Sequence, residues 1–108
     1  MRIKKVTTSK KTYMLTIDAM LLFDCQRELK LNLLEKIGQI VSLQDAGNLS
    51  DEGKALSDFY AAVGVSLARC KENNFESWED ALSNLEISEM NKLAVELINS
   101  ISETNSKN

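Results

Sequence analysis

The chain has 108 residues, of which 44% are apolar and 27% charged, and its formal net charge is −3. A chain of this length forms one domain, because a second core would have too few residues to bury. The absence of proline favours long, uninterrupted helices. Because the sequence has neither an apolar run of the roughly 18 residues that span a bilayer nor a signal peptide, we expect a soluble, cytoplasmic protein with no membrane partner.

The first 17 residues predict a short β-hairpin. Tyr13, Leu15 and Ile17 recur with the period of two that is typical of a strand. Residues 3–8 upstream are rich in β-branched side chains, and residues 9–11 supply a polar turn. An isolated hairpin is marginal in water, so its apolar face must pack against helices.

The next segment predicts two helices. Asp18 is expected to cap a helix over residues 19–29. Asn32 then resembles a fresh cap, with Glu35 three residues later as in a capping box. The second helix carries a mainly apolar face and ends near Gly47, a residue suited to the left-handed turn that closes helices. That apolar face comprises Leu33, Leu34, Ile37, Ile40 and Val41.

The third helix is predicted by Ser50 as its cap and by an apolar face kept for about four turns. Arg69 near its end suits the helix dipole. The residues of this face are Leu56, Phe59, Tyr60, Val63, Leu67 and Cys70.

Two more caps complete the prediction. Ser77 with Asp80 begins a short helix through about Leu85, and Ser88 caps a last helix. Residues 104–108 are polar and are expected to form a disordered tail. The predicted fold class is mainly α (α+β at the N-terminus), with a short N-terminal β-hairpin (about residues 1–17) followed by a bundle of about five helices. These elements form a single helical domain over residues 1–103.

The sequence contains little that points to chemistry. It has no histidine, which removes the usual general base and the commonest metal ligand. Cys25 and Cys70 lack metal-ligand spacing and are expected to be reduced, buried thiols. The four glycines match no phosphate-binding loop. Carboxylate groups at residues 51–52 and 76–80 lie at helix starts, where the dipole explains them. We therefore expect no enzyme, no cofactor and no metal.

Apolar residues beyond a single stripe indicate a protein-binding surface. They occur on the first and last predicted helices, and the same breadth suggests a homo-oligomer. Trp78 has two interpretations, a staple to the core or an anchor at an interface. The candidate protein-binding residues are Met20, Leu21, Phe23, Trp78, Leu93, Leu97 and Ile101.

A basic cluster near the start leaves an alternative function open. An edge strand protected by lysines explains the cluster, and a DNA-associated regulatory protein would explain it too. The third helix presents small and acidic residues between its apolar ones, a poor surface for base edges, so we expect no nucleic-acid partner. A non-catalytic helical adaptor is the remaining alternative. The cluster comprises Arg2, Lys4, Lys5, Lys10 and Lys11.

The order of three sequence phrases carries a family resemblance. A strand runs directly into a helix, a long capped helix follows, and a short capped helix precedes the last helix. Over about residues 10 to 101 this layout resembles the small tail assembly chaperones of long-tailed phages and prophages. The phrases are Tyr13-Met14-Leu15-Thr16-Ile17-Asp18, Leu49-Ser50-Asp51-Glu52 and Ser77-Trp78-Glu79-Asp80-Ala81-Leu82.

The resemblance implies a role in virion assembly. Proteins of this family coat the aggregation-prone tape-measure protein and help tail-tube subunits polymerise around it, in the cytoplasm of a bacterial host. Many are made in two forms, the longer through a ribosomal frameshift. The resemblance therefore implies the tape-measure protein and the tail-tube protein as partners of this chain.

Overall fold

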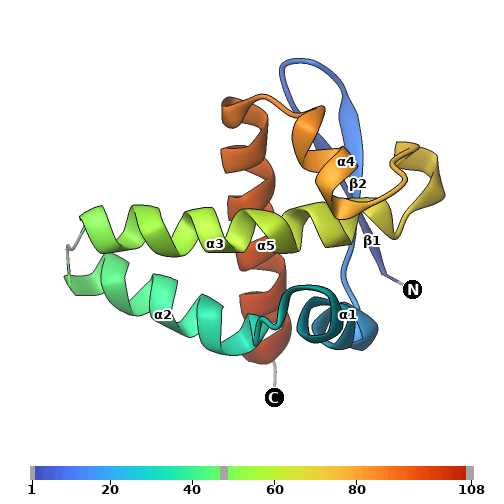
Figure 1. Cartoon of the computed structure of the whole chain (residues 1–108). Helices are drawn as coiled ribbons and strands as arrows, with labels where there is room; N and C mark the ends of the chain where they lie inside the picture. Colours follow the sequence, from blue (N-terminus) through green and yellow to red (C-terminus); the bar gives the residue numbers. More distant parts are fainter. Residues whose placement is uncertain (1, 47–48, 107–108) are drawn as a thin grey trace.

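The structure, a computed structural model, describes residues 2–46 and 49–106, with side chains described for residues 2–39 and 59–101. Over these residues a two-stranded hairpin is followed by five α-helices and one 3₁₀ turn, which confirms the predicted fold class. Figure 1 shows α3 and α5 crossing near the centre, with α2 running below α3. The elements are β1 (Ile3–Thr7), β2 (Thr12–Thr16), α1 (Ala19–Leu29), α2 (Leu33–Ala46), α3 (Leu49–Ala68), η1 (Lys71–Asn73), α4 (Trp78–Ser83) and α5 (Ile87–Ser106).

The hairpin pairs β1 antiparallel to β2, with Val6 opposite Tyr13. Its turn is closed by the Thr8 N–H, which donates to the Lys11 carbonyl at 2.9 Å. Val6, Tyr13 and Leu15 are buried, so this face of the hairpin packs into the core, as the period of two predicted.

The outer edge of β2 is covered by polar side chains from two other elements. Ser66 of α3 accepts from the Thr16 N–H at 2.9 Å. Asn73 of η1 accepts from the Met14 N–H at 2.9 Å and donates to the Met14 carbonyl at 2.7 Å. An uncovered strand edge would present these groups to another chain, so Ser66 and Asn73 protect this side of the sheet.

Three predicted N-caps are confirmed by their hydrogen bonds. The Asp18 carboxylate accepts from the Leu21 N–H, Asn32 accepts from the Glu35 N–H, and Ser77 accepts from the Asp80 N–H, each at 3.1 Å. The first helix keeps its predicted bounds. Its end is closed by Lys30 in the left-handed region (φ 55°), whose N–H donates to the Gln26 carbonyl.

Two other predicted caps are wrong. Helices α3 and α5 begin at Leu49 and Ile87, two residues earlier than caps at Ser50 and Ser88 predict, so both serines lie within the first turns. At α5 Glu86 precedes the first helical residue, and its N–H donates to the Glu89 carboxylate at 3.2 Å, so the cap position is Glu86 and not Ser88. Gly47 lies outside the described residues.

The ends of the last two helices also differ from the prediction. Helix α4 ends at Ser83, two residues before Leu85. Helix α5 continues to Ser106, three residues into the tail predicted from residue 104. The buried residues of α5 recur every three or four positions, which keeps one face of the helix against the core.

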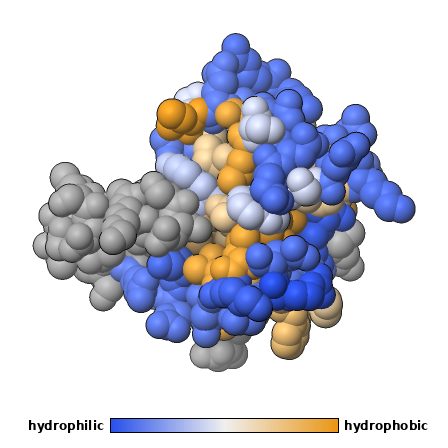
Figure 2. Space-filling view, in the orientation of Figure 1, coloured by the Kyte–Doolittle hydropathy of each residue, from blue (hydrophilic) through white to orange (hydrophobic). Residues whose placement is uncertain are grey.

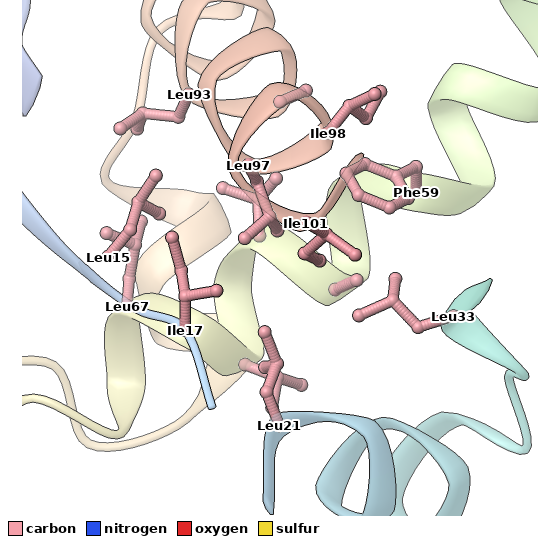
Figure 3. Packing of buried hydrophobic residues seen from close by; sticks show 14 of the residues in the cluster. Leu15, Ile17, Leu21, Leu33, Phe59, Leu67, Leu93, Leu97, Ile98 and Ile101 are labelled. Atoms are coloured by element: carbon pink, nitrogen blue, oxygen red, sulfur yellow. The ribbon is translucent and has the colours of Figure 1, made fainter. Parts of the chain in front are cut away.

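The core lies where α5 meets the hairpin, α1, α2 and α3. In Figure 3, Leu97 and Ile101 of α5 lie between Leu15 of the hairpin on one side and Phe59 of α3 on the other. Phe59, Leu97 and Leu15 have no exposed surface, and Ile101 is 6% exposed. The third helix, predicted from its apolar face, thus contributes the largest fully buried side chain.

Two glycines provide a matched test of the α3–α4 contact. A Cβ on Gly64 would lie 2.8 Å from the Trp78 carbonyl oxygen, whereas a Cβ on Gly38 would meet nothing within 4 Å. Gly64→Ala should lower the free energy of unfolding by about 1–3 kcal/mol through overpacking. Gly38→Ala should raise it by about 0.5–1 kcal/mol, because alanine is the better helix former. Urea unfolding measures both, and shifts in the same direction would contradict the close packing of α3 on α4.

Candidate protein-binding surface

Four of the seven candidate binding residues are buried in the core. Leu93 and Leu97 have no exposed surface, Leu21 is 1% exposed and Ile101 is 6% exposed. Their inclusion among surface candidates was wrong, because helical spacing of apolar residues marks a core-facing side as well as a binding side. Trp78 is partly buried and packs against the core, as expected of a staple, and its role at an interface stays a prediction.

The two remaining candidates lie side by side on the outside of α1. Phe23 is 65% exposed and Met20 is 51% exposed. Leu21 and Cys25 face the core, and Phe23 is two residues from each, which places it about 200° around the helix from both. We call Met20 and Phe23 the α1 ridge. An exposed aromatic residue next to a thioether presents the side chains that anchor protein interfaces.

An apolar hollow lies at the start of α1, and its lining includes Ala19 and Leu22, the sequence neighbours of Met20 and Phe23. Its volume is about 280 Å³, and it lies between the starts of α1 and α2 and the C-terminal part of α5. Leu34, at its rim, is 42% exposed, whereas its neighbour Leu33 is 1% exposed. The lining residues are Arg2, Ile17, Asp18, Ala19, Leu21, Leu22, Leu34 and Ile101. The hollow thus offers a recess for an apolar side chain on the flank of α1 that carries Leu22.

Salt bridges fix the orientation of α1. Arg69, at the end of α3, lies 2.7 Å from Asp18 Oδ1 through Nη2 and 2.9 Å from Asp24 Oδ2 through Nε. Asp24 also accepts from Arg27 Nη2 at 2.6 Å. The side chains of Arg69 and Asp24 are only 17% and 13% exposed, so this network is partly shielded from water and stronger than a surface pair. It holds the core-facing side of α1 inward and leaves Phe23 outward.

A second, charged hollow lies on the other side of α1. It has a volume of about 350 Å³ and includes residues of α1, α3 and α4. Partly buried Trp78 contributes to its wall. Figure 2 shows apolar residues forming a strip near the centre of the molecule, framed by hydrophilic ones. The residues lining the charged hollow are Asp24, Arg27, Glu28, Val65, Ala68, Arg69, Glu76, Ser77, Trp78 and Glu79.

A buried carboxylate joins the hairpin to α5. Glu89 is 3% exposed and accepts hydrogen bonds from Thr8 Oγ1 at 2.7 Å, Tyr13 Oη at 2.9 Å and the Glu86 N–H at 3.2 Å. Burial alone would raise its pKa, but these bonds and the charge of Lys10 lower the pKa below its ordinary value of 4.5. Burial and the neighbouring Glu89 raise the pKa of Tyr13 to about 12. A carboxylate that accepts three hydrogen bonds and has a lowered pKa is suited to structure rather than to proton transfer near neutral pH.

Both cysteines are free and buried, as predicted. Burial, with the nearby charge of Asp24, raises the pKa of Cys25 to about 12, the opposite of what activates a thiol nucleophile. Within the part of the chain that the structure describes, no group of three or more acidic, cysteine or histidine residues could hold a metal ion. No helix in that part is long and apolar enough to cross a membrane.

Three of the five residues of the N-terminal basic cluster contact other side chains of the same molecule. Lys4 lies 3.0 Å from Glu96, and Lys10 lies 3.4 Å from Glu86. Lys11 lies over the rings of Tyr13 and Phe75, 5.1 and 5.6 Å from their centroids. These contacts tie the hairpin to α5 and to the segment before α4, and they reduce the positive charge available to a nucleic acid.

Sequence reasoning missed the recess beside α1. Leu34 was assigned to the core face of the second helix together with Leu33, but Leu34 is 42% exposed whereas Leu33 is 1% exposed. Arg69 was assigned to the helix dipole, and no local pattern announces its partners in α1. Comparisons with protein-family models, with curated proteins and with solved structures found no match to this chain.

Proposed function

We propose that this protein is a non-catalytic binding module that holds an apolar segment of another protein on α1. The observation that carries the proposal is the exposed Phe23 on α1, a helix that also lines an apolar hollow and that is held by Arg69. An exposed phenylalanine costs free energy in water, roughly 25 cal/mol for each Å² of apolar surface left uncovered. Covering it with a partner recovers that free energy, so the surface favours association.

We further propose that the partner is a phage tape-measure protein and that the module acts as a tail assembly chaperone in the bacterial cytoplasm. The support is the family resemblance, which is carried by the strand-to-helix sequence ending at Asp18 and by the short helix capped by Ser77. Tape-measure proteins are long and aggregation-prone, so a module with an exposed apolar ridge and net negative charge suits their protection. Assistance to assembly of the tail-tube protein belongs to the same proposal.

Co-expression tests the partner class. The chain is produced together with the tape-measure protein encoded beside it, and the soluble fraction of the tape-measure protein is compared with and without the chain. We expect a gain in solubility and a complex that survives size-exclusion chromatography. The absence of both, with each protein well expressed, would contradict the proposed function.

A further inference from the structure

We propose, on the basis of the proposed function, that the segment held on α1 is an amphipathic helix with a basic flank. Its apolar stripe covers the α1 ridge and enters the apolar hollow. A lysine or arginine on its flank enters the charged hollow, where Glu76 and Glu79 receive it beside Trp78. The partner is therefore selected by charge as well as by apolar contact.

Consecutive residues of α1 connect the two hollows. Leu22 lines the apolar hollow, Phe23 is exposed, and Asp24 lines the charged hollow. Successive residues of a helix point about 100° apart, so these three residues span the outward side of α1 from one hollow to the other. The two hollows therefore lie on opposite flanks of Phe23, and long side chains of a helix that lies on Phe23 extend towards each of them.

The net negative charge of the charged hollow indicates that the flank of the partner helix is basic. Its lining includes four carboxylates and two guanidinium groups, which leaves an excess of two negative charges. Arg69 is held by Asp18 and Asp24, and the ion pairs of Arg27 are with Asp24 and Glu28. Glu76 and Glu79 have no ion pair among the residues that the structure describes, and both are exposed.

Trp78 adds a second attraction for a cation. It lies between Ser77 and Glu79 in the wall of the charged hollow and is only partly buried. A lysine or arginine side chain that lies over an indole face is attracted by the ring as well as by nearby carboxylates. A second copy of this chain would bring the same excess of carboxylates to this hollow, so charge favours a different, basic partner over self-association.

Two synthetic peptides of equal length test the proposal. Both form amphipathic helices with the same leucine stripe, and one carries lysines on its flanks where the other carries glutamates. Fluorescence of Trp78, the sole tryptophan of the chain, reports binding to the charged hollow, and calorimetry reports binding in general. At low salt the lysine peptide should bind at least about five-fold more tightly, and the preference should shrink at high salt.

Charge-neutralised variants test which carboxylates cause the preference for the lysine peptide. Glu76→Gln combined with Glu79→Gln should remove most of it, whereas Glu72→Gln, an exposed carboxylate on η1, should leave it unchanged. Equal binding of the two peptides, or an unchanged preference in the double variant, would overturn the basic flank while leaving the proposed function intact. Binding of neither peptide would overturn both, and concentration-dependent self-association that blocks the lysine peptide would instead assign the surface to a second copy.

Discussion

Phe59→Ala is expected to lower the free energy of unfolding by about 3–5 kcal/mol, a large part of the roughly 5–15 kcal/mol that stabilises a domain of this kind. Phe59 is fully buried and is the largest such side chain among the described residues. Its ring packs where α3 meets α5, as Figure 3 shows, so truncation leaves a cavity at the centre of the fold. Urea denaturation followed by circular dichroism measures the loss.

Phe23→Ala provides the matched control for this prediction. The same side chain is removed from a position that is 65% exposed, so the free energy of unfolding should change by no more than about 0.5 kcal/mol. Comparable losses in the two variants would contradict the assignment of Phe59 to the core and of Phe23 to the surface.

Glu89→Ala is expected to lower the free energy of unfolding by about 2–4 kcal/mol, because it leaves the buried Tyr13 hydroxyl without its acceptor and breaks two further hydrogen bonds. The Tyr13 hydroxyl and the Glu86 N–H both lose their acceptor, and the hairpin loses its hydrogen bonds to Glu89 of α5. Glu89→Gln should be milder, since its single carbonyl oxygen can still accept on one side of the original carboxylate.

The pH dependence of the same contact has a defined sign. The folded-state pKa of Glu89 lies below its ordinary value of 4.5, so its contribution is present above pH 4.5 and is lost as the pH falls through the folded pKa. Tyr13 has a pKa raised from 10.0 to about 12, so its contribution is present below pH 10 and is lost as the pH rises towards 12.

The stability difference between the unmodified chain and Glu89→Gln should therefore be constant near neutral pH and narrow in acid. A difference that widens in acid would contradict the lowered pKa of Glu89.

Local interactions explain what the sequence predicted correctly. The hairpin follows from alternation in residues 12–17, and the starts of α1 and α4 follow from caps whose partners lie three residues away. Each of these signals depends on residues close together in the chain, where side-chain chemistry and helix geometry suffice for a prediction.

Contacts between distant residues explain what the sequence did not reveal. Ser66 and Thr16 are separated by 50 positions, Asn73 and Met14 by 59, and Arg69 and Asp18 by 51. No short pattern announces such pairs, although together they cover the edge of β2 and orient α1. The candidate binding residues also include some that the sequence could have assigned correctly and some that it could not. Helical spacing alone could not separate Leu93 and Leu97 from a binding face, whereas the angle between Phe23 and the buried Leu21 could have identified the α1 ridge.

The central claim, that the α1 ridge binds a partner protein, is tested most directly by calorimetric titration with a tape-measure segment recovered by co-expression. The variant Met20→Ser with Phe23→Ser is compared with Ile87→Ser, which alters an apolar residue that is 77% exposed at the start of α5. We expect the ridge variant to bind at least about ten-fold more weakly, a loss of about 1.4 kcal/mol, and Ile87→Ser to bind like the unmodified chain. Unchanged affinity in a folded ridge variant, or equal losses in both variants, would contradict the claim.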